Sequence, residues 1–165
     1  MKNILIVLAI AGVGFADEYG VTNPQEMAIV DDATSKPSIA TCTSGYYSTK
    51  SGSHEIAFQI FENCAEAGYT GAMTWLAYMY KNGRGGKEEP EKSAYWDMRA
   101  AEAGDEIGML NYGIDLLTGY GVEKNETEGR MWIDKAADAG TKSAVILRDA
   151  GYDVSVITPD TIDEN

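Results

Sequence analysis

Two consecutive stretches of equal length decide the fold. Residues 69–104 read YTGAMTWLAYMYKNGRGGKEEPEKSAYWDMRAAEAG, and residues 105–140 read DEIGMLNYGIDLLTGYGVEKNETEGRMWIDKAADAG. Aligned without gaps, these 36-residue stretches share eight identities, where chance would give about two. The identical pairs are Met73/Met109, Gly83/Gly119, Gly85/Gly121, Trp96/Trp132, Ala100/Ala136, Ala101/Ala137, Ala103/Ala139 and Gly104/Gly140. A period of this length predicts an array of structural repeats.

Each repeat is predicted to form two helices joined by a Gly-x-Gly turn. The first helix is expected over 70–81 and again over 106–117, and in each copy the glycine pair ends it, because glycine permits a left-handed turn. The second helix begins at Pro90 and, in the next copy, after Asn125. Asp105 is placed to cap the first helix of the second copy. Helix pairs that bury their faces only against neighbouring pairs form an α-solenoid.

The combined pattern resembles the Sel-1-like repeat, a relative of the tetratricopeptide repeat. The first copy carries it through Leu76-Ala77, Tyr80, Gly83-x-Gly85, Ala94-Tyr95-Trp96, Ala100-Ala101 and Gly104. The second copy carries it through Gly113, Gly119-x-Gly121-Val122, Trp132, Lys135-Ala136-Ala137 and Gly140. Departures from the pattern are Gly86, Arg130 and Asp115.

The resemblance implies an all-α protein: a short right-handed α-solenoid of helix-turn-helix repeats with irregular N- and C-terminal extensions. The repeat domain is expected over 54–150, with a half repeat at 54–68, full repeats at 69–104 and 105–140, and a half repeat at 141–150. The segment 17–53 is rich in Ser, Thr, Gly and Pro and is predicted to be mostly irregular. Beyond it, Asp153–Ile157 alternates briefly like a strand, within an acidic tail at 151–165.

The first sixteen residues have the features of a secretory signal peptide. Lys2 is followed by the apolar run Ile4–Val13, and Gly14-Phe15-Ala16 places small residues at a cleavage site. The run is shorter than the roughly 20 residues that a membrane-spanning helix needs. We therefore expect an exported protein with no membrane insertion after signal cleavage. The bacterial periplasm is preferred, and extracellular or host-directed secretion is the alternative.

The net charge limits the class of partner, and the two cysteines indicate a cross-link. The chain carries 13 Lys+Arg and 26 Asp+Glu, a formal net charge of −13, which argues against binding nucleic acid. In an oxidising compartment Cys42 and Cys64 are most simply one disulfide, closing a loop for which chain-entropy models give roughly 3 kcal/mol. A redox-active pair is the alternative, although the C-x-x-C spacing is absent.

The sequence offers no catalytic constellation, cofactor motif or metal site. His54 is the one imidazole, and we interpret it as a residue near a helix start. Glu88-Glu89 and Asp105-Glu106 are expected at helix starts, where carboxylates complement the helix dipole. A weak divalent-cation site among the surface acids remains an alternative. The resemblance includes an exported, cysteine-rich branch with penicillin binding and β-lactamase activity, but its cysteines pair within repeats and the two full repeats here contain none.

The first helix of the second repeat is apolar almost all round, more than packing into a stack requires. In tetratricopeptide-like stacks this leading helix lines the concave groove, and an exposed apolar patch there is usually an interaction site. The resemblance therefore implies a partner-binding groove lined by Thr74, Tyr78, Ile107, Leu110, Ile114, Leu117 and Ile146.

The expected function is that of a scaffold or adaptor that binds a peptide or helix with a basic face from another protein. The alternative occupants of the groove are the chain's own 17–53 segment, its Val154–Ile157 stretch, or a second copy through self-association. The competing functions are a β-lactamase-like or cell-wall-peptide-binding protein and a self-assembling structural envelope component.

Overall fold

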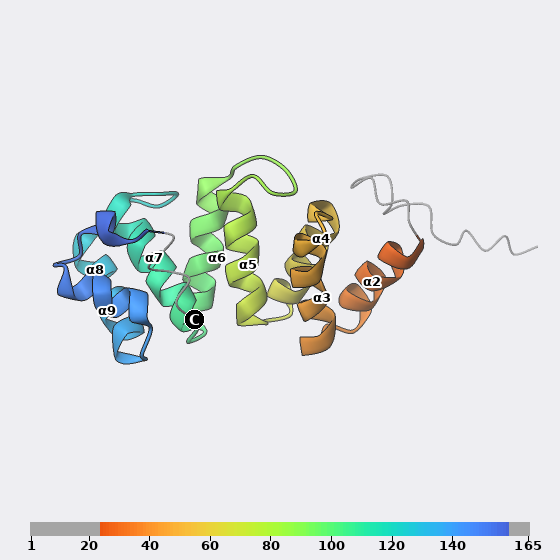
Figure 1. The fold of residues 1–165 in the computed structure, drawn as a ribbon, viewed down its shortest axis with the longest axis horizontal. Coiled ribbons are helices and arrows are strands. Elements are labelled where there is room, and N and C mark those ends of the chain that lie inside the picture. Colours follow the sequence, from red (N-terminus) through yellow and green to blue (C-terminus); the bar gives the residue numbers. More distant parts are fainter. Residues whose placement is uncertain (1–23, 159–165) are drawn as a thin grey trace, which may run out of the picture.

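The computed structural model describes residues 24–158, and within them the chain forms eight α-helices and one short 3₁₀ turn (Figure 1). The predicted signal peptide, residues 17–23 and residues 159–165 of the acidic tail lie outside the described residues. No strand is present in the described part, which confirms the all-α prediction. The elements are α2 (Pro24–Ser35), α3 (Ile39–Lys50), α4 (His54–Glu66), α5 (Thr70–Lys81), α6 (Pro90–Glu102), α7 (Glu106–Thr118), α8 (Glu126–Asp138), α9 (Lys142–Asp149) and η1 (Val154–Val156).

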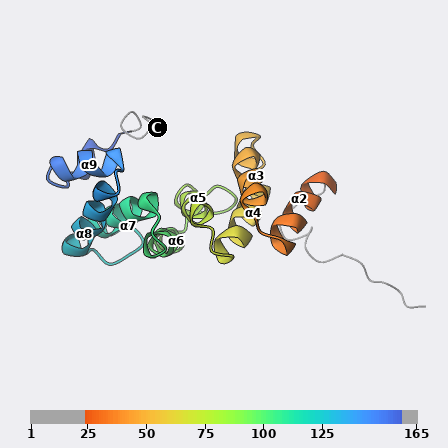
Figure 2. The same cartoon turned by 90° about the horizontal axis from the view of Figure 1, so that it is seen from below.

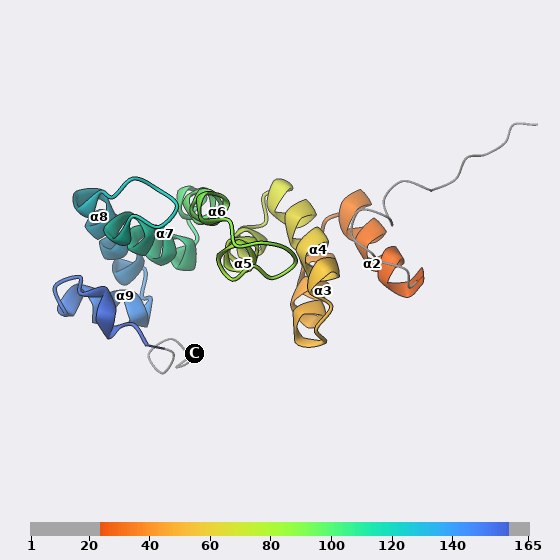
Figure 3. The ribbon, with the colours of Figure 1, turned by 90° about the horizontal axis from the view of Figure 1, so that it is seen from above.

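The helices stack in chain order along one elongated row, from α2 at one end to α8 and α9 at the other (Figure 1). From α3 onward each helix packs mainly on its sequence neighbours, which gives the pairs α3/α4, α5/α6 and α7/α8, followed by α9, while α2 packs mainly on α4. The leading helices α3, α5, α7 and α9 lie along one side of the row, and α4, α6 and α8 lie along the other (Figures 2 and 3). The predicted solenoid of helix pairs is therefore present.

The predicted helix starts and stops are confirmed. The Asp105 carboxylate accepts hydrogen bonds from the backbone N–H groups of Ile107 and Gly108, at 3.1 and 2.9 Å. The Asn125 side chain accepts from the Glu128 N–H at 3.2 Å and caps α8. Pro90 occupies the first turn of α6. The C-cap of α7 is left-handed, and the turn glycines have positive φ angles that L-residues rarely adopt.

Residues 17–53 were predicted to be mostly irregular, and for the described part of this segment that prediction is wrong: the chain forms α2 and α3. The composition was misleading because Ser and Thr side chains favour caps and turns. In α3 their hydroxyls instead bond back to carbonyls within the helix, and Ser38 forms a reciprocal capping box with Thr41. The predicted half repeat 54–68 is consequently the second helix of an additional pair, α3/α4.

The predicted disulfide joins Cys42 of α3 to Cys64 of α4, with 5.8 Å between their Cα atoms. The Cys64 side chain is wholly buried in the core and Cys42 nearly so. Phe61, one turn before Cys64, also lies in this core, and Gly45 lets α3 approach it closely. The cross-link therefore ties the Ser/Thr-rich α3 to an amphipathic helix with a well-defined apolar face.

The strand-like pattern at Asp153–Ile157 is also corrected. Residues Val154–Val156 form a 3₁₀ turn, which Asp153 caps by accepting from the Ser155 N–H at 3.0 Å. The apolar side chains of this turn pack on the core cluster of α7, α8 and α9, so their alternation reflects packing against helices and not sheet formation. Between residues 24 and 158, no helix is long and apolar enough to span a membrane.

Candidate protein-binding groove

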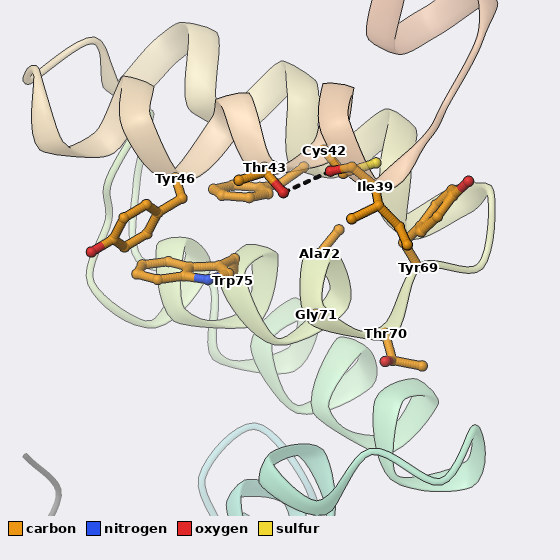
Figure 4. Close-up of a pocket in the computed structure, with 10 residues that line it drawn as sticks. Ile39, Cys42, Thr43, Tyr46, Tyr69, Thr70, Gly71, Ala72 and Trp75 are labelled. Atoms are coloured by element: carbon orange, nitrogen blue, oxygen red, sulfur yellow. Dashed lines mark hydrogen bonds between the residues drawn. The ribbon is translucent and has the colours of Figure 1, made fainter. Parts of the chain in front are cut away.

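A groove with a volume of about 360 Å³ lies between the leading helices α3 and α5 (Figure 4). Tyr46 and Ile39 reach into it from α3, while Trp75 and Ala72 reach into it from α5. We call it the α3–α5 groove. Its lining residues are Ile39, Cys42, Thr43, Tyr46, Phe61, Tyr69, Thr70, Gly71, Ala72 and Trp75.

Four of the ten lining residues are aromatic: Tyr46, Phe61, Tyr69 and Trp75. The Trp75 indole stacks on Phe61, with 5.7 Å between centroids and 7° between planes. Tyr46 and Tyr78 meet Trp75 edge-on, at 5.5 and 5.7 Å between centroids. Such contacts hold large side chains in place without hydrogen bonds. At the far end, the Tyr69 hydroxyl donates to the Pro37 carbonyl at 3.0 Å and anchors the α2–α3 connection.

The α3–α5 groove is uncharged and partly open to solvent. Ile39 is 77% exposed and Tyr46 is 36% exposed. Neither α3 nor α5 contains an acidic residue, although the chain has 26 of them. The charged side chains of these two helices are Lys50 and Lys81, each in the last turn. An apolar ligand group can enter such a groove without desolvating a charge.

The residues that the sequence predicts for a groove are only partly accessible. Tyr78, Ile107 and Ile146 are each about two-fifths exposed, and Thr74 is half-buried, with its hydroxyl donating to the Gly71 carbonyl at 3.0 Å. Leu110 is 7% exposed, so it is buried and offers almost no surface to a partner.

The surplus apolar surface of α7 has an internal explanation. Ile114 and Leu117 are half-buried and belong to the same apolar cluster as Val154, Val156 and Ile157 of the C-terminal turn. These side chains and the C-terminal turn pack against one buried core of α7, α8 and α9, so part of the apolar surface of α7 is used inside the protein.

Sequence reasoning missed the α3 side of the groove. Ile39, Thr43 and Tyr46 fall in the segment predicted to be irregular, so no face could be assigned to them. A usable signal was present: a Cys42–Cys64 disulfide brings the residues around Cys42 onto the following helix, including the Tyr46-Tyr47 pair one turn later.

A second feature is a buried polar network between the two full repeats. The Asp97 carboxylate of α6, 2% exposed, accepts from the Asn111 amide of α7 at 3.0 Å. Asp115 of α7, 0% exposed, pairs with the Lys81 ammonium of α5 at 3.4 Å. The second carboxylate oxygen of Asp115 is buried without a hydrogen-bond partner among the described residues.

Burial shifts the acidity of both carboxyls. Desolvation raises the pKa of Asp97 to about 8; the Asn111 hydrogen bond lowers it, and the nearby Asp115 adds to the rise. Desolvation likewise raises the pKa of Asp115 to about 6, against the opposing effect of Lys81. Neither carboxyl lines any of the three pockets described along the chain. In residues 24–158, no group of three or more His, Cys, Asp or Glu side chains is arranged to hold a metal ion.

This architecture defines a class: an α-solenoid of helix pairs with an open groove on its leading helices. Residues 70–105 and 107–141 match the Sel1 repeat. The chain therefore contains two Sel1 repeats, as its sequence pattern predicts. Proteins built from these repeats are generally protein–protein interaction scaffolds and are typically not enzymes.

Solved structures with the same fold include Helicobacter pylori cysteine rich protein B, at 23% identity and a TM-score of 0.58, covering 73% of this chain and 90% of that one. A Sel1 repeat protein from Oxalobacter formigenes matches at 23% identity and a TM-score of 0.56, over 58% of this chain and 28% of its own length. A protective antigen present in uropathogenic Escherichia coli strains, displaying an SLR fold, matches at 26% identity and a TM-score of 0.54, over 66% of this chain and 24% of its own. No curated protein sequence gives a significant match.

Proposed function

We propose that this protein is an exported scaffold that binds a peptide segment of a partner protein in the α3–α5 groove. The observation that carries the proposal is an open, uncharged, aromatic groove on a chain of net charge −13. Binding sites with these properties use a buried aromatic or aliphatic anchor, because apolar burial supplies most of the binding free energy.

The occupant is an extended or helical segment with one large apolar side chain and basic flanks. The apolar side chain packs in the α3–α5 groove against the touching rings of Tyr46 and Trp75. None of the lining residues is charged, and the Lys50 ammonium lies outside the lining, 5.3 Å from the centre of the Tyr46 ring. The basic flanks are favoured by the acidic remainder of the chain, which attracts positive partners and makes association sensitive to salt.

The binding surface extends along the leading helices beyond the α3–α5 groove. Tyr78 contacts Trp75 at one edge of the groove, and Ile107 and Ile146 stay exposed on α7 and α9. We propose that these side chains, with Thr74 at the margin, contact the parts of the partner segment that leave the groove. This retains the accessible members of the groove expected from the sequence.

Two observations support export. The first sixteen residues have the pattern of a secretory signal peptide. In addition, Cys42 and Cys64 form a disulfide, and such bonds persist in oxidising compartments. The periplasm is the proposed location, and signal cleavage in a bacterial host with recovery from the periplasmic fraction would test it.

A matched pair of tyrosines tests the binding site. Tyr46 lines the groove, while its neighbour Tyr47 does not and is 67% exposed. Peptides are selected on the mature protein from a displayed random library, resynthesised with a fluorescent label, and titrated by anisotropy. We expect Tyr46→Ala to weaken binding at least about tenfold, roughly 1.4 kcal/mol, and Tyr47→Ala to change it little.

A second variant tests the absence of charge. Thr43 is exposed and lines the groove, so Thr43→Arg should block an apolar anchor while leaving the fold intact by circular dichroism. Equal loss in the Tyr46 and Tyr47 variants, or no enriched peptide at all, would contradict the proposed site. Sedimentation of the mature protein distinguishes self-association, and nitrocefin turnover would point instead to the β-lactamase-like alternative.

A further inference from the structure

At the three junctions between successive helix pairs, equivalent sequence positions hold side chains of different chemical character. Where α4 meets α5, Phe61 stacks on Trp75. One repeat later, 36 residues along, the same two positions hold the hydrogen-bonded pair of Asp97 and Asn111. One repeat later again they hold the fully buried pair Ile133 and Leu147.

A second position at the middle junction follows the same pattern. Asp115 is equivalent to Met79 of the preceding repeat, and both side chains are 0% exposed. The middle junction is therefore polar where the junctions on either side are apolar. Each carboxyl has at most one polar side-chain partner, which is poor compensation for a buried charge.

We propose that the junction of α6 with α7 is a proton-dependent joint, closed when the carboxyls of Asp97 and Asp115 are protonated and loosened when they ionise. A neutral carboxyl at position 97 can keep its hydrogen bond to Asn111 inside the junction. An ionised one leaves a charge in the interface between the first and second full repeats, and Asp115 lies close enough to repel it.

One cation, Lys81, compensates the negative charge at the joint in part. From α5, Lys81 faces both carboxyls, but it bonds only Asp115 and its ammonium also lies 4.6 Å from the centre of the Tyr120 ring. From the start of α7, Asp105 adds a like charge toward Asp97. On the α8 side, Glu128 acts on Tyr112. The pKa of Tyr120 is raised to about 12 by burial and by Glu88, so this phenol stays neutral near physiological pH.

The sign of the pH dependence follows from the shifts. Both folded-state pKa values lie above the ordinary aspartate value of 3.8, near 8 for Asp97 and near 6 for Asp115. Between these limits the unfolded chain binds fewer protons than the folded chain, so stability falls as pH rises. The loss begins near pH 4, is complete for Asp115 above about pH 6, and continues for Asp97 to about pH 8.

The test compares urea unfolding of the mature protein with Asp97→Asn and Asp115→Asn between pH 4.5 and 8. Other acids also titrate in this range. The contribution of each carboxyl is therefore the difference between the parent and the variant in how the free energy of unfolding changes with pH. One pKa unit corresponds to a tenfold change in an equilibrium constant. Between pH 4.5 and 8, the unfolding equilibrium constant should therefore rise at least about tenfold more for the parent than for Asp97→Asn. Identical pH profiles would overturn the proposal.

Two further measurements locate the effect and do not depend on a variant that folds. A carboxyl-carbon NMR titration of the parent should show Asp97 ionising above about pH 6, and an ordinary aspartate pKa would overturn the proposal. Amide hydrogen exchange is measured at several pH values and corrected for its intrinsic pH dependence. The backbone amides of α6 and α7 should become less protected as the pH rises. Those of α4, which meets α5 through the apolar contact of Phe61 with Trp75, should not. Equal loss in α4 would also overturn it.

Discussion

Single glycines set the spacing between neighbouring helices. Gly108 stands in the first turn of α7, where an added Cβ would lie 2.5 Å from the Ala100 Cβ and 2.8 Å from the Ala101 nitrogen. Gly113, further along α7, would meet the Ile133 side chain at 2.7 Å. Small residues at these repeated positions allow α7 to touch the backbone of α6 and α8. They are the physical reason for the small-residue periodicity in the sequence.

Gly108→Ala should destabilise the protein by about 1 to 3 kcal/mol, the range for overpacking a well-filled contact, measured by urea unfolding at constant pH. Gly71→Ala is the matched control. Gly71 occupies the first turn of the leading helix α5, and an added Cβ there meets nothing within 4 Å. That substitution should leave stability unchanged or raise it by up to about 1 kcal/mol, because alanine is the better helix former. Equal effects of the two would contradict this account.

Among the elements, α3 depends most on its neighbours. Its sequence has little apolar periodicity, and its hydroxyl-rich surface is typical of caps and turns. It is held on α4 by the Cys42–Cys64 disulfide and by the close contact of Gly45 with Phe61. Because α3 provides one wall of the binding groove, the disulfide supports the proposed site as well as the fold.

Replacing both cysteines with alanine should destabilise the protein by roughly 3 kcal/mol, the chain-entropy value for a loop of this length. Thermal unfolding of parent and double variant, with and without reductant, measures the effect. Limited proteolysis should then cut first within 36–53, since α3 has lost its covalent tie. Reductant should not shift the double variant, and a parent that is insensitive to reductant would contradict this role.

At the scale of the whole molecule, the solenoid needs covers at its ends. Two Sel1 repeats are matched, at residues 70–105 and 107–141, fewer than the three or so that repeat arrays usually require for stability. At one end α2 packs on α3 and α4. At the other end Val154, Val156 and Ile157 pack on the cluster formed by α7, α8 and α9. These segments bury apolar faces that a further repeat would otherwise cover.

A chain truncated after Gly151 should lose at least about 2 kcal/mol of stability, because several partly buried apolar side chains are removed together. It should also bind a hydrophobic dye and show concentration-dependent dimerisation in sedimentation, since part of the apolar cluster beneath the turn becomes exposed. A chain ending at Thr158 keeps all of the named contacts and serves as the control. A truncated chain as stable and as monomeric as this control would show that the C-terminal turn is not a cover.

The central repeats were predictable because their signals are local. Helix boundaries follow from caps such as Asp105, from Pro90 and from the turn glycines, and each of these acts within one or two turns of helix. The additional pair α3/α4 was not predictable in the same way. Its first helix is stabilised by contacts with α4 and α5, which do not appear as a period within α3 itself.

The sequence by itself determined the repeat period, the helix pairs of both full repeats, the disulfide pairing and the net charge. These features can be read from the sequence because helix capping and turns depend on residues close together in the chain, and because the repeat spacing and the net charge are counted directly. Only the tertiary structure decided which apolar side chains remain exposed: Leu110 is in the core, the C-terminal turn packs on the cluster formed by α7, α8 and α9, and the open groove lies between α3 and α5. Exposure depends on what packs across a junction, and the partners at a junction belong to different helices of the chain.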